Sequence, residues 1–366
     1  MKERLVRYKE FIEREYISGL TRNKEYSLES LDKNLLKKIK KGQFKRIVFT
    51  GMGCSAIVSD MIQGFFVSEK IPIPVFVVND YNFEYFIDPE ILKDGKTLVI
   101  ISSYSGHSQE PIKAYYKFKE YTKDIVFLTS GGKLEQIAKK DNISVIYWKI
   151  VNPDREYPLF HAPQYFSILL DIFHELGFLK TNYEKELKET AEYLKNEFSK
   201  KKIKEAEEIA KKLRNRDIIL LASPKWMTAL LKLSKMHFNE IAMTAAHRNF
   251  IHEFGHSEVA IFSEPKIEHG LLIYKDKNED DYVKAKIENM QKIFSEKVPQ
   301  NKKISVSIID INQDNFFKQL FSSLLFIHYI TYYLGIYYNV KSRELISRSA
   351  GNPWYNIKTI NEELKS

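Results

Sequence analysis

Two short segments of the chain combine glycines and hydroxyl side chains where an apolar stretch gives way to a helical one. Residues 51–56 read GMGCSA, and residues 102–108 read SSYSGHS. Glycine lets the backbone approach a ligand, and the N–H groups at a helix start, together with serine hydroxyls, donate hydrogen bonds to an anion. A phosphate monoester has three oxygens that accept from several serines at once, whereas a pyrophosphate bridge depends more on the backbone. The two segments therefore favour a sugar phosphate as the ligand.

The first segment has two other interpretations. It fits the G-x-G-x-x-A string of a dinucleotide site, with Asp80 at the end of the next apolar run. It also fits a tight turn that holds no ligand, and the second segment fits a serine-rich helix cap. An NAD-dependent enzyme therefore remains a minor hypothesis.

A third segment, residues 239–258, gathers histidines and carboxylates. Residues 252–256 read HEFGH and match H-E-x-x-H, in which two histidines one helical turn apart bind zinc and the glutamate is a general base. That site needs a helix through all five residues, yet Gly255 lies inside it and the run EVAIF at 258–262 predicts a strand. A zinc hydrolase is therefore a minor hypothesis, and we expect no metal.

Alternating strands and helices must position these segments. Short β-branched runs alternate with amphipathic stretches, a pattern typical of a parallel sheet covered on both faces. The expected strands of the first half lie at 46–51, 74–80, 97–103, 125–130 and 143–149. Because the carboxyl ends of parallel strands meet at one edge of a sheet, we expect the two glycine- and serine-containing segments to converge there.

The pattern restarts in the second half of the chain. A helix is expected from Pro163 to about Leu179, and a charged helical stretch from about 183 to 216. There follow an expected strand at 217–223, a long helix through Ala246, and strands at 258–262, 270–275 and 303–309. The predicted fold is α/β, with two lobes that are each a mainly parallel sheet flanked by helices. The predicted boundaries are an N-terminal helical segment 1–45, a first lobe 46–180, a helical connector 181–216, and a second lobe with C-terminal helices 217–366.

Composition narrows the class of protein. The 366 residues include a single cysteine, Cys54, which excludes an internal disulfide framework and, with a charged N-terminus, predicts a cytoplasmic location. The net charge of +9 suits an anionic partner, but 48 interspersed acidic residues argue against a nucleic-acid surface. The apolar stretch 316–338 contains Lys318 and His328, so we expect a buried core or subunit-interface helix and no membrane span.

Taken together, the motifs resemble those of the sugar isomerase (SIS) superfamily, specifically the archaeal-type bifunctional phosphoglucose/phosphomannose isomerases. GMGCS at 51–55 and SYSGHSQE at 103–110 match the two serine-containing turns of that family, with Cys54 in place of a glycine. Lys235, Asn239-Glu240 and the E-x-x-H-x-E string at 253–258 follow the family order in the second half. The resemblance spans residues from about Arg46 to the C-terminus. It implies two SIS lobes.

The resemblance also assigns roles to residues. Gly53 and Cys54 would contact the substrate, Glu240 would transfer the proton, and His256 would open the sugar ring from the second subunit of a homodimer. The substrate phosphate would be bound by Ser55, Ser103, Ser105 and Ser108.

The family also uses a lysine near the C-terminus and an arginine before the helix that follows the first lobe. Lys365 is the expected lysine, with Lys358 as the alternative, and Arg155 or His161 would take the place of the arginine. The sequence departs from the family at His252, where a proline is usual, and at Ser257, where an asparagine is usual.

The leading hypothesis is an isomerase that interconverts glucose 6-phosphate and fructose 6-phosphate, with mannose 6-phosphate as an expected second substrate. The proton shift between C1 and C2 passes through a cis-enediolate and needs one carboxylate and a cation or donor near the developing oxyanion. It needs no metal or redox cofactor. The main alternative is a non-catalytic sugar-phosphate-binding SIS protein, which would have no use for the carboxylate of Glu240.

Overall fold

The computed structural model describes residues 4–153 and 158–341. In its first half, six strands form one sheet, and the apolar runs at 46–51, 97–102 and 125–129 are almost completely buried, as expected for inner strands of a parallel sheet. The strand order is β1-β6-β5-β4-β2-β3, with β1 antiparallel to β6 and the other pairs parallel. The strands are β1 (Tyr26–Ser27), β2 (Arg46–Gly51), β3 (Val75–Val78), β4 (Thr97–Ser102), β5 (Ile125–Thr129) and β6 (Ser144–Trp148). The five strands expected in this half are confirmed, whereas β1 was not anticipated.

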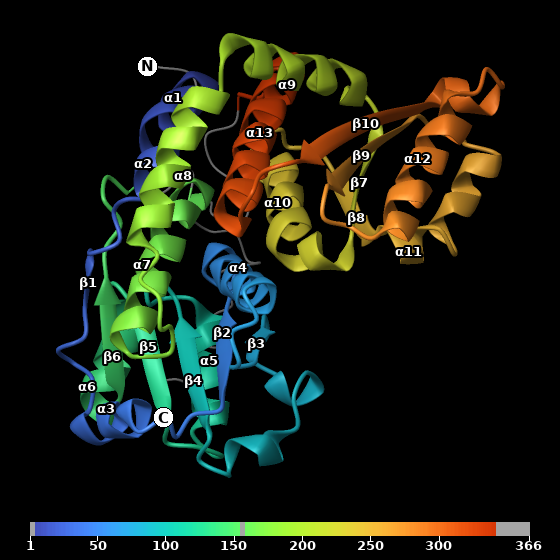
Figure 1. Cartoon of the computed structure of the whole chain (residues 1–366). Coiled ribbons are helices and arrows are strands. Elements are labelled where there is room, and N and C mark those ends of the chain that lie inside the picture. Colours follow the sequence, from blue (N-terminus) through green and yellow to red (C-terminus); the bar gives the residue numbers. More distant parts are fainter. Residues whose placement is uncertain (1–3, 154–157, 342–366) are drawn as a thin grey trace.

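The second half contains a four-stranded parallel sheet of order β10-β9-β7-β8. Its strands are β7 (Asp217–Ala222), β8 (Ala246–Phe250), β9 (His269–Asp276) and β10 (Ile304–Ile311). The two sheets confirm the predicted α/β class with two mainly parallel sheets flanked by helices (Figure 1). The boundaries proposed from the sequence at 180 and 216 stay predictions.

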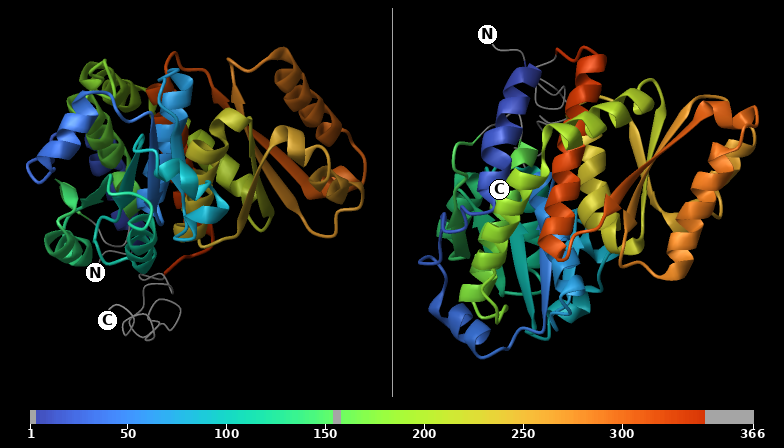
Figure 2. Two further views of the ribbon diagram at one scale, coloured as in Figure 1. Left: turned by 90° about the horizontal axis from the view of Figure 1, so that it is seen from below. Right: turned by 45° about the horizontal axis from the view of Figure 1, so that its top comes forward.

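Helices fill the space between the two sheets and cover their outer faces. On the outer face of the first sheet lie α5 (Gln109–Phe118) and α6 (Gly132–Asp141), and on that of the second lie α11 (Ile251–Phe254) and α12 (Asp281–Ser295). Six helices share one apolar core with the inner faces of the sheets: α4 (Cys54–Ser68), α7 (Ala162–Glu175), α8 (Glu184–Glu197), α9 (Lys200–Leu213), α10 (Lys232–Glu240) and α13 (Phe316–Tyr337). Of these, α4, α10 and α13 lie between the two sheets, as two further views also show (Figure 2). The N-terminal segment adds α1 (Arg4–Phe11), a π-helical turn (Ile12–Tyr16), α2 (Ile17–Gly19) and α3 (Lys33–Lys40).

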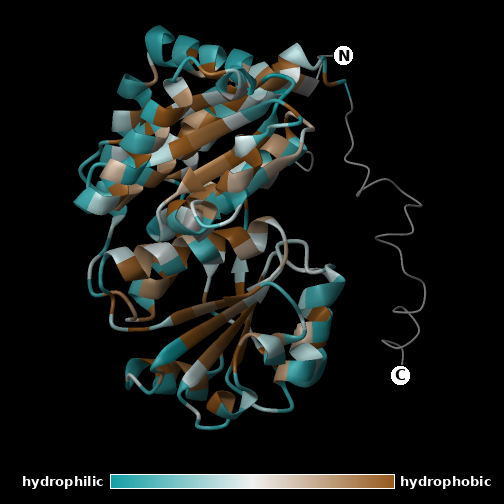
Figure 3. Ribbon diagram, turned by 90° about the vertical axis from the view of Figure 1, so that its right-hand side faces the viewer, coloured by the Kyte–Doolittle hydropathy of each residue, from teal (hydrophilic) through white to brown (hydrophobic). Residues whose placement is uncertain are grey.

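One apolar core runs through this middle layer and touches both sheets. It includes Phe49 and Ile100 of the first sheet, Leu220 and Leu272 of the second, and the helices between them. Apolar residues dominate most strands of both sheets (Figure 3). Among the described helices, α13 is long and apolar enough to cross a membrane, but 78% of its apolar window is buried inside the protein. The expectation of a core helix at 316–338 is therefore confirmed.

Two elements expected from the sequence are wrong. The helix expected through Ala246 ends at Glu240, and Ala246 begins β8 instead. This edge strand, AHRNF, buries only its first residue and so lacks an apolar signal. The strand expected at 258–262 is a 3₁₀ turn, Glu258–Ser263, in which Phe262 is the buried side chain. A short apolar run does not by itself distinguish a strand from a turn packed on a core.

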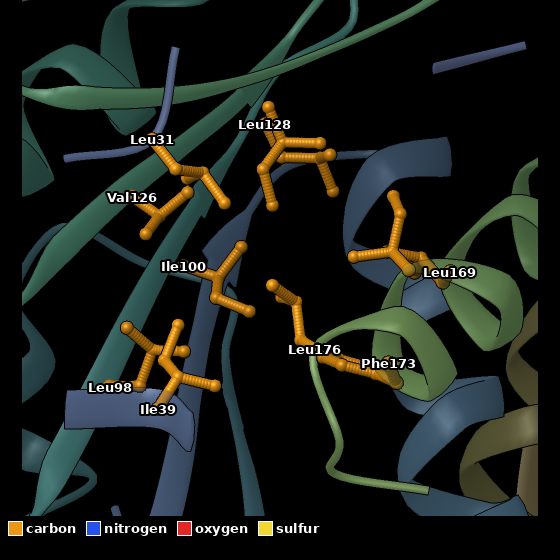
Figure 4. Close-up of a pocket in the computed structure, with 11 residues that line it drawn as sticks. Leu31, Ile39, Leu98, Ile100, Val126, Leu128, Leu169, Phe173 and Leu176 are labelled. Carbon is orange, nitrogen blue, oxygen red and sulfur yellow. The ribbon is translucent and has the colours of Figure 1, made fainter. Parts of the chain in front are cut away.

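A small cavity lies in the core between the first sheet and α7. Its volume is about 10 Å³, and its lining is entirely apolar, with Leu98, Ile100 and Val126 from the sheet facing Phe173 and Leu176 from α7 (Figure 4). A space of this size without polar partners does not hold an ordered water. It is a packing defect and not a ligand site.

Candidate active site

The carboxyl ends of β2, β4 and β5 bring three turns together at one edge of the first sheet. The strand register pairs Gly51 with Ser102 and Ser102 with Leu128, so the chain leaves the sheet at the same level in all three strands. Each strand is followed by a helix, α4, α5 or α6, whose N-terminus lies at this edge. Helix N-termini present unpaired N–H groups and a partial positive charge, which favours an anion at this edge.

The turn after β4 carries three of the expected phosphate ligands. Ser103 is buried, and its hydroxyl donates to Ser108 Oγ over 3.3 Å. Ser108 occupies the N-cap of α5 without a capping bond to that helix, and Ser105 is exposed. His107 Nδ1 lies 2.6 Å from the Ser105 carbonyl, which can only accept, so Nδ1 carries the proton. The turn therefore presents hydroxyl groups and a helix start on one side.

Two of the turns interlock through their backbones. Gly106 has φ +67°, and a Cβ there would lie 1.9 Å from the carbonyl oxygen of Gly131. Ser130 N donates to Tyr104 O over 2.9 Å, and Leu134 N donates to Gly106 O over 3.0 Å. This third turn was not predicted from the sequence, although the pair Gly131-Gly132 after an apolar run is a usable signal for a turn.

The turn after β2 leaves open space above the edge. Gly53 is the N-cap of α4 with φ +58°, and apart from its chain neighbours no atom of the described residues lies within 4 Å of the position its Cβ would take. Cys54 and Ser55 follow in the first turn of α4, both half-buried. The structure thus places Gly53, Cys54 and Ser55 at the same edge as the serines of the second turn.

Packing across the two sheets brings Glu240 to this end of the molecule. Gly64 on α4 meets Ala229 just before α10, with 3.4 Å between Ala229 Cβ and the Cβ position of Gly64, and Asp60 on α4 forms an ion pair with Lys232 on α10. Since the residue number rises on one helix as it falls on the other, the two helices run antiparallel. Ser55 is five residues before Asp60, and Glu240 eight residues after Lys232, which is about 7.5 Å and about 12 Å along the helices at 1.5 Å per residue. The half-buried Glu240 therefore lies at the same end as the serine-containing turns, which are the expected phosphate site.

The ion pair between α4 and α10 belongs to a small charged cluster. Asp60 is buried, and burial raises the pKa of its carboxyl, while Lys232 and Arg248 on β8 act in the opposite direction. Burial also lowers the pKa of Arg248. None of these residues was singled out from the sequence, because 172 positions separate Asp60 from Lys232.

His256 lies away from Glu240 within one chain. α11 and the turn after it pack on the outer face of the second sheet, whereas α10 packs on the inner face, and the side chain of His256 is exposed. α11 ends at Phe254, so residues 252–256 do not lie on one helix. Within the described residues, no group of three or more histidine, cysteine, aspartate or glutamate side chains is arranged to hold a metal ion.

Three of the residues expected from the resemblance, Arg155, Lys358 and Lys365, lie outside the described residues. His161 is described, and it is buried directly before α7, with its ring edge-on to Phe11 at 6.3 Å. One turn later, Tyr165 shares a hydrogen bond with Ser102. His161 therefore lies on the side of α7 that faces the carboxyl edge of the sheet.

Comparison with known proteins identifies the family. Residues 202–345 match the family described as the bacterial phospho-glucose isomerase C-terminal SIS domain. A bifunctional phosphoglucose/phosphomannose isomerase from Caldicellulosiruptor bescii is 31% identical over 242 residues, which cover 64% of this chain and 68% of that protein. The chain belongs to this isomerase family.

Another relative agrees with this assignment, and a solved structure agrees with the fold. The bifunctional phosphoglucose/phosphomannose isomerase of Thermoplasma volcanium is 26% identical over 304 residues, 82% of this chain and 88% of that protein. The C-terminal domain of glucosamine-fructose-6-phosphate aminotransferase from Francisella tularensis superposes with a TM-score of 0.64 at 14% identity, covering 94% of this chain and 99% of that one. This likeness shows the fold, so the expected pair of SIS lobes in this phosphoglucose/phosphomannose isomerase family member is confirmed.

Proposed function

We propose that this protein interconverts glucose 6-phosphate and fructose 6-phosphate and accepts mannose 6-phosphate as a second aldose. The antiparallel packing of α4 and α10, which puts the carboxylate of Glu240 at the same end as the phosphate turns, carries the proposal. A phosphate cradle and a carboxylate at one end are what a proton shift on a phosphorylated sugar requires.

The phosphate is held away from the reacting carbons. Its oxygens accept from the four serine hydroxyls and from the N–H groups at the starts of the helices that follow the turns. Gly53 and Cys54 have small side chains, so their backbone lies close to the phosphate. Binding energy at the phosphate orients C1 and C2 toward the base and is available to the chemical step. The serines in this cradle are Ser55, Ser103, Ser105 and Ser108.

Glu240 carries the proton between the two carbons. Its carboxylate takes the proton from C2 of the aldose and a cis-enediolate forms, in which the hydroxyl proton passes from O2 to O1. The protonated Glu240 then returns its proton to C1 to give the ketose. The substrate is neither oxidised nor reduced overall, so the step requires no external electron acceptor. The negative charge that develops on O1 and O2 needs donors, and His161, Arg155 and Lys365 are the candidates for that role.

His256 is proposed to act across a subunit interface. It lies on the outer face of the second sheet, on the opposite face from Glu240, so it would reach the active site of a neighbouring copy and open the sugar ring there. The proposed assembly is a homodimer in the cytoplasm, and its proposed partners are hexose 6-phosphates, not nucleic acid or membrane.

Replacing Glu240 with Gln tests the proposal. Glutamine keeps the shape of the side chain but does not accept the proton, so kcat should fall by roughly 10² to 10⁴. Formation of fructose 6-phosphate from each aldose phosphate is measured with a coupled assay, and substrate binding with calorimetry. Wild-type protein that binds these sugars without converting them would instead support the non-catalytic alternative. Unchanged kcat in Glu240→Gln would move the base to Glu253 or Glu258.

A further inference from the structure

A chain of buried hydrogen bonds links the N-terminal helix to α10. Tyr8 Oη on α1 lies 2.5 Å from His328 Nδ1 on α13, and His328 Nε2 lies 3.0 Å from His237 Nε2 on α10. His237 Nδ1 lies 2.7 Å from the carbonyl oxygen of Leu233, one turn earlier on the same helix. All three side chains are essentially inaccessible to solvent. This hydrogen-bond chain therefore joins three helices that are distant in sequence.

The partners fix where the protons lie. The Leu233 carbonyl only accepts, so His237 Nδ1 carries a proton, and in a neutral ring Nε2 is then an acceptor. His328 must donate to it through Nε2–H, which leaves His328 Nδ1 to accept from the Tyr8 hydroxyl. With both rings neutral, each of the four ring nitrogens has a hydrogen-bond partner of the right kind. Burial favours that state, because it lowers the pKa of His237 to about 4 and the pKa of His328 well below its usual range.

Aromatic side chains surround the hydrogen-bond chain. Phe160 stacks on His328 at 4.9 Å, Tyr16 meets the same ring edge-on at 4.7 Å, and Tyr332 stacks near Tyr8 at 6.4 Å. The titratable groups that face the pair are thus Tyr8, Tyr16 and Tyr332, and the carboxylate of Glu13 acts on Tyr332 from the π-helical turn. Within the described residues, no carboxylate or ammonium group is hydrogen-bonded to either imidazole.

The hydrogen-bond chain ends beside Glu240, the proposed base. His237 is three residues before Glu240, in the last turn of α10. α13 also contacts the end of this turn, since a Cβ on Gly335 would lie 3.4 Å from the carbonyl oxygen of Ile241 and 3.2 Å from the side chain of Leu5. The last turn of α10 is therefore held by α13 at two points, and α1 covers both.

We propose that Tyr8, His328 and His237 form a positioning chain that fixes the last turn of α10 and thereby the carboxylate of Glu240. The inference rests on the proposed function, because it assigns these residues to the geometry of the same base. It also means that the N-terminal helix α1 helps to hold the geometry of the active site. Loss of this hydrogen-bond chain should lower kcat. It should leave KM nearly unchanged, because the turns proposed to bind the phosphate lie on the other sheet.

The structure offers a matched pair of variants for the test. Tyr8→Phe removes the first hydroxyl of the chain, whereas Tyr16→Phe removes an equally buried hydroxyl that donates to Phe321 O on α13 over 3.2 Å. Both substitutions remove a buried hydrogen bond next to His328, but only Tyr8→Phe breaks the hydrogen-bond chain. We expect kcat on fructose 6-phosphate to fall about tenfold or more in Tyr8→Phe and less than about twofold in Tyr16→Phe, because small misplacements of a reacting group are costly.

A second pair keeps the proposal testable if Tyr8→Phe does not fold. In His237→Gln the amide oxygen takes the place of Nε2 and accepts from His328, whereas His237→Leu has no acceptor. Glutamine should therefore retain several-fold more kcat than leucine at a temperature where both are folded by circular dichroism. Equal kcat within either pair, with an active wild type, overturns the positioning role and leaves the isomerase proposal intact. An inactive wild type overturns both.

Discussion

Acidification should destabilise this protein through His237 in particular. The imidazole is neutral and fully buried, and burial lowers its pKa from about 6.5 to about 4. Because the folded-state pKa is depressed, the unfolded chain takes up a proton first as the pH falls. The contribution of this group to stability is complete above pH 6.5 and is lost progressively as the pH falls toward 4.

The size of the effect follows from the same two values. At about 1.4 kcal/mol per pH unit of separation, protonation of His237 in the unfolded chain removes roughly 2 to 3 kcal/mol between pH 7.5 and pH 4.5. His328 acts in the same direction, since its pKa is also lowered by burial. A loss of this size is a large fraction of the stability of a typical domain.

Urea unfolding at the two pH values measures the effect in wild type and in His237→Gln. Glutamine keeps an acceptor for His328 but does not titrate, so every carboxylate contributes equally in both proteins. The free energy of unfolding should fall by roughly 2 to 3 kcal/mol more in wild type than in the variant. The same loss in both proteins would refute the neutral, buried state of His237.

Three further predictions concern the proposed site. Ser105→Ala or Ser108→Ala should mainly raise KM in steady-state assays. Each lost charge-assisted hydrogen bond to the phosphate costs about 1.5 to 3 kcal/mol in both the ground state and the transition state. An unchanged KM in both variants would mean that the phosphate binds elsewhere. His256→Ala should be impaired on cyclic hexose 6-phosphates and retain solvent-proton exchange on an open-chain analogue, whereas equal losses on both would place His256 in the enediolate step. Protein treated with a chelator should keep full isomerase activity, and stoichiometric zinc whose removal abolishes activity would contradict the metal-free mechanism.

The sequence predicted those parts of the fold that bury a continuous apolar run. β2, β4 and β5 are buried on both faces, so their β-branched runs are visible without a structure. β8 is an edge strand that buries only Ala246, and the run at 258–262 is short enough to fit either a strand or a turn. Both elements were therefore assigned incorrectly.

The candidate site likewise has parts that could be predicted from the sequence and parts that could not. The serine turns depend on local spacing, so residues 51–56 and 102–108 were found from the sequence. The antiparallel contact of α4 with α10 and the chain from Tyr8 to His237 join residues far apart in sequence, and no local pattern encodes them. The exposed position of His256 on the outer face also depends on packing and not on motif spacing.

The apolar layer shared by the two sheets has a consequence for dissecting the molecule. Phe49 and Leu220 belong to one continuous core, so neither half of the chain encloses its own inner face. A truncated gene product that ends after the first sheet would expose the apolar sides of α4 and α7 and would be expected to aggregate. Heat should melt the two halves together in a single calorimetric transition, because the loss of either removes the partner surface of the other.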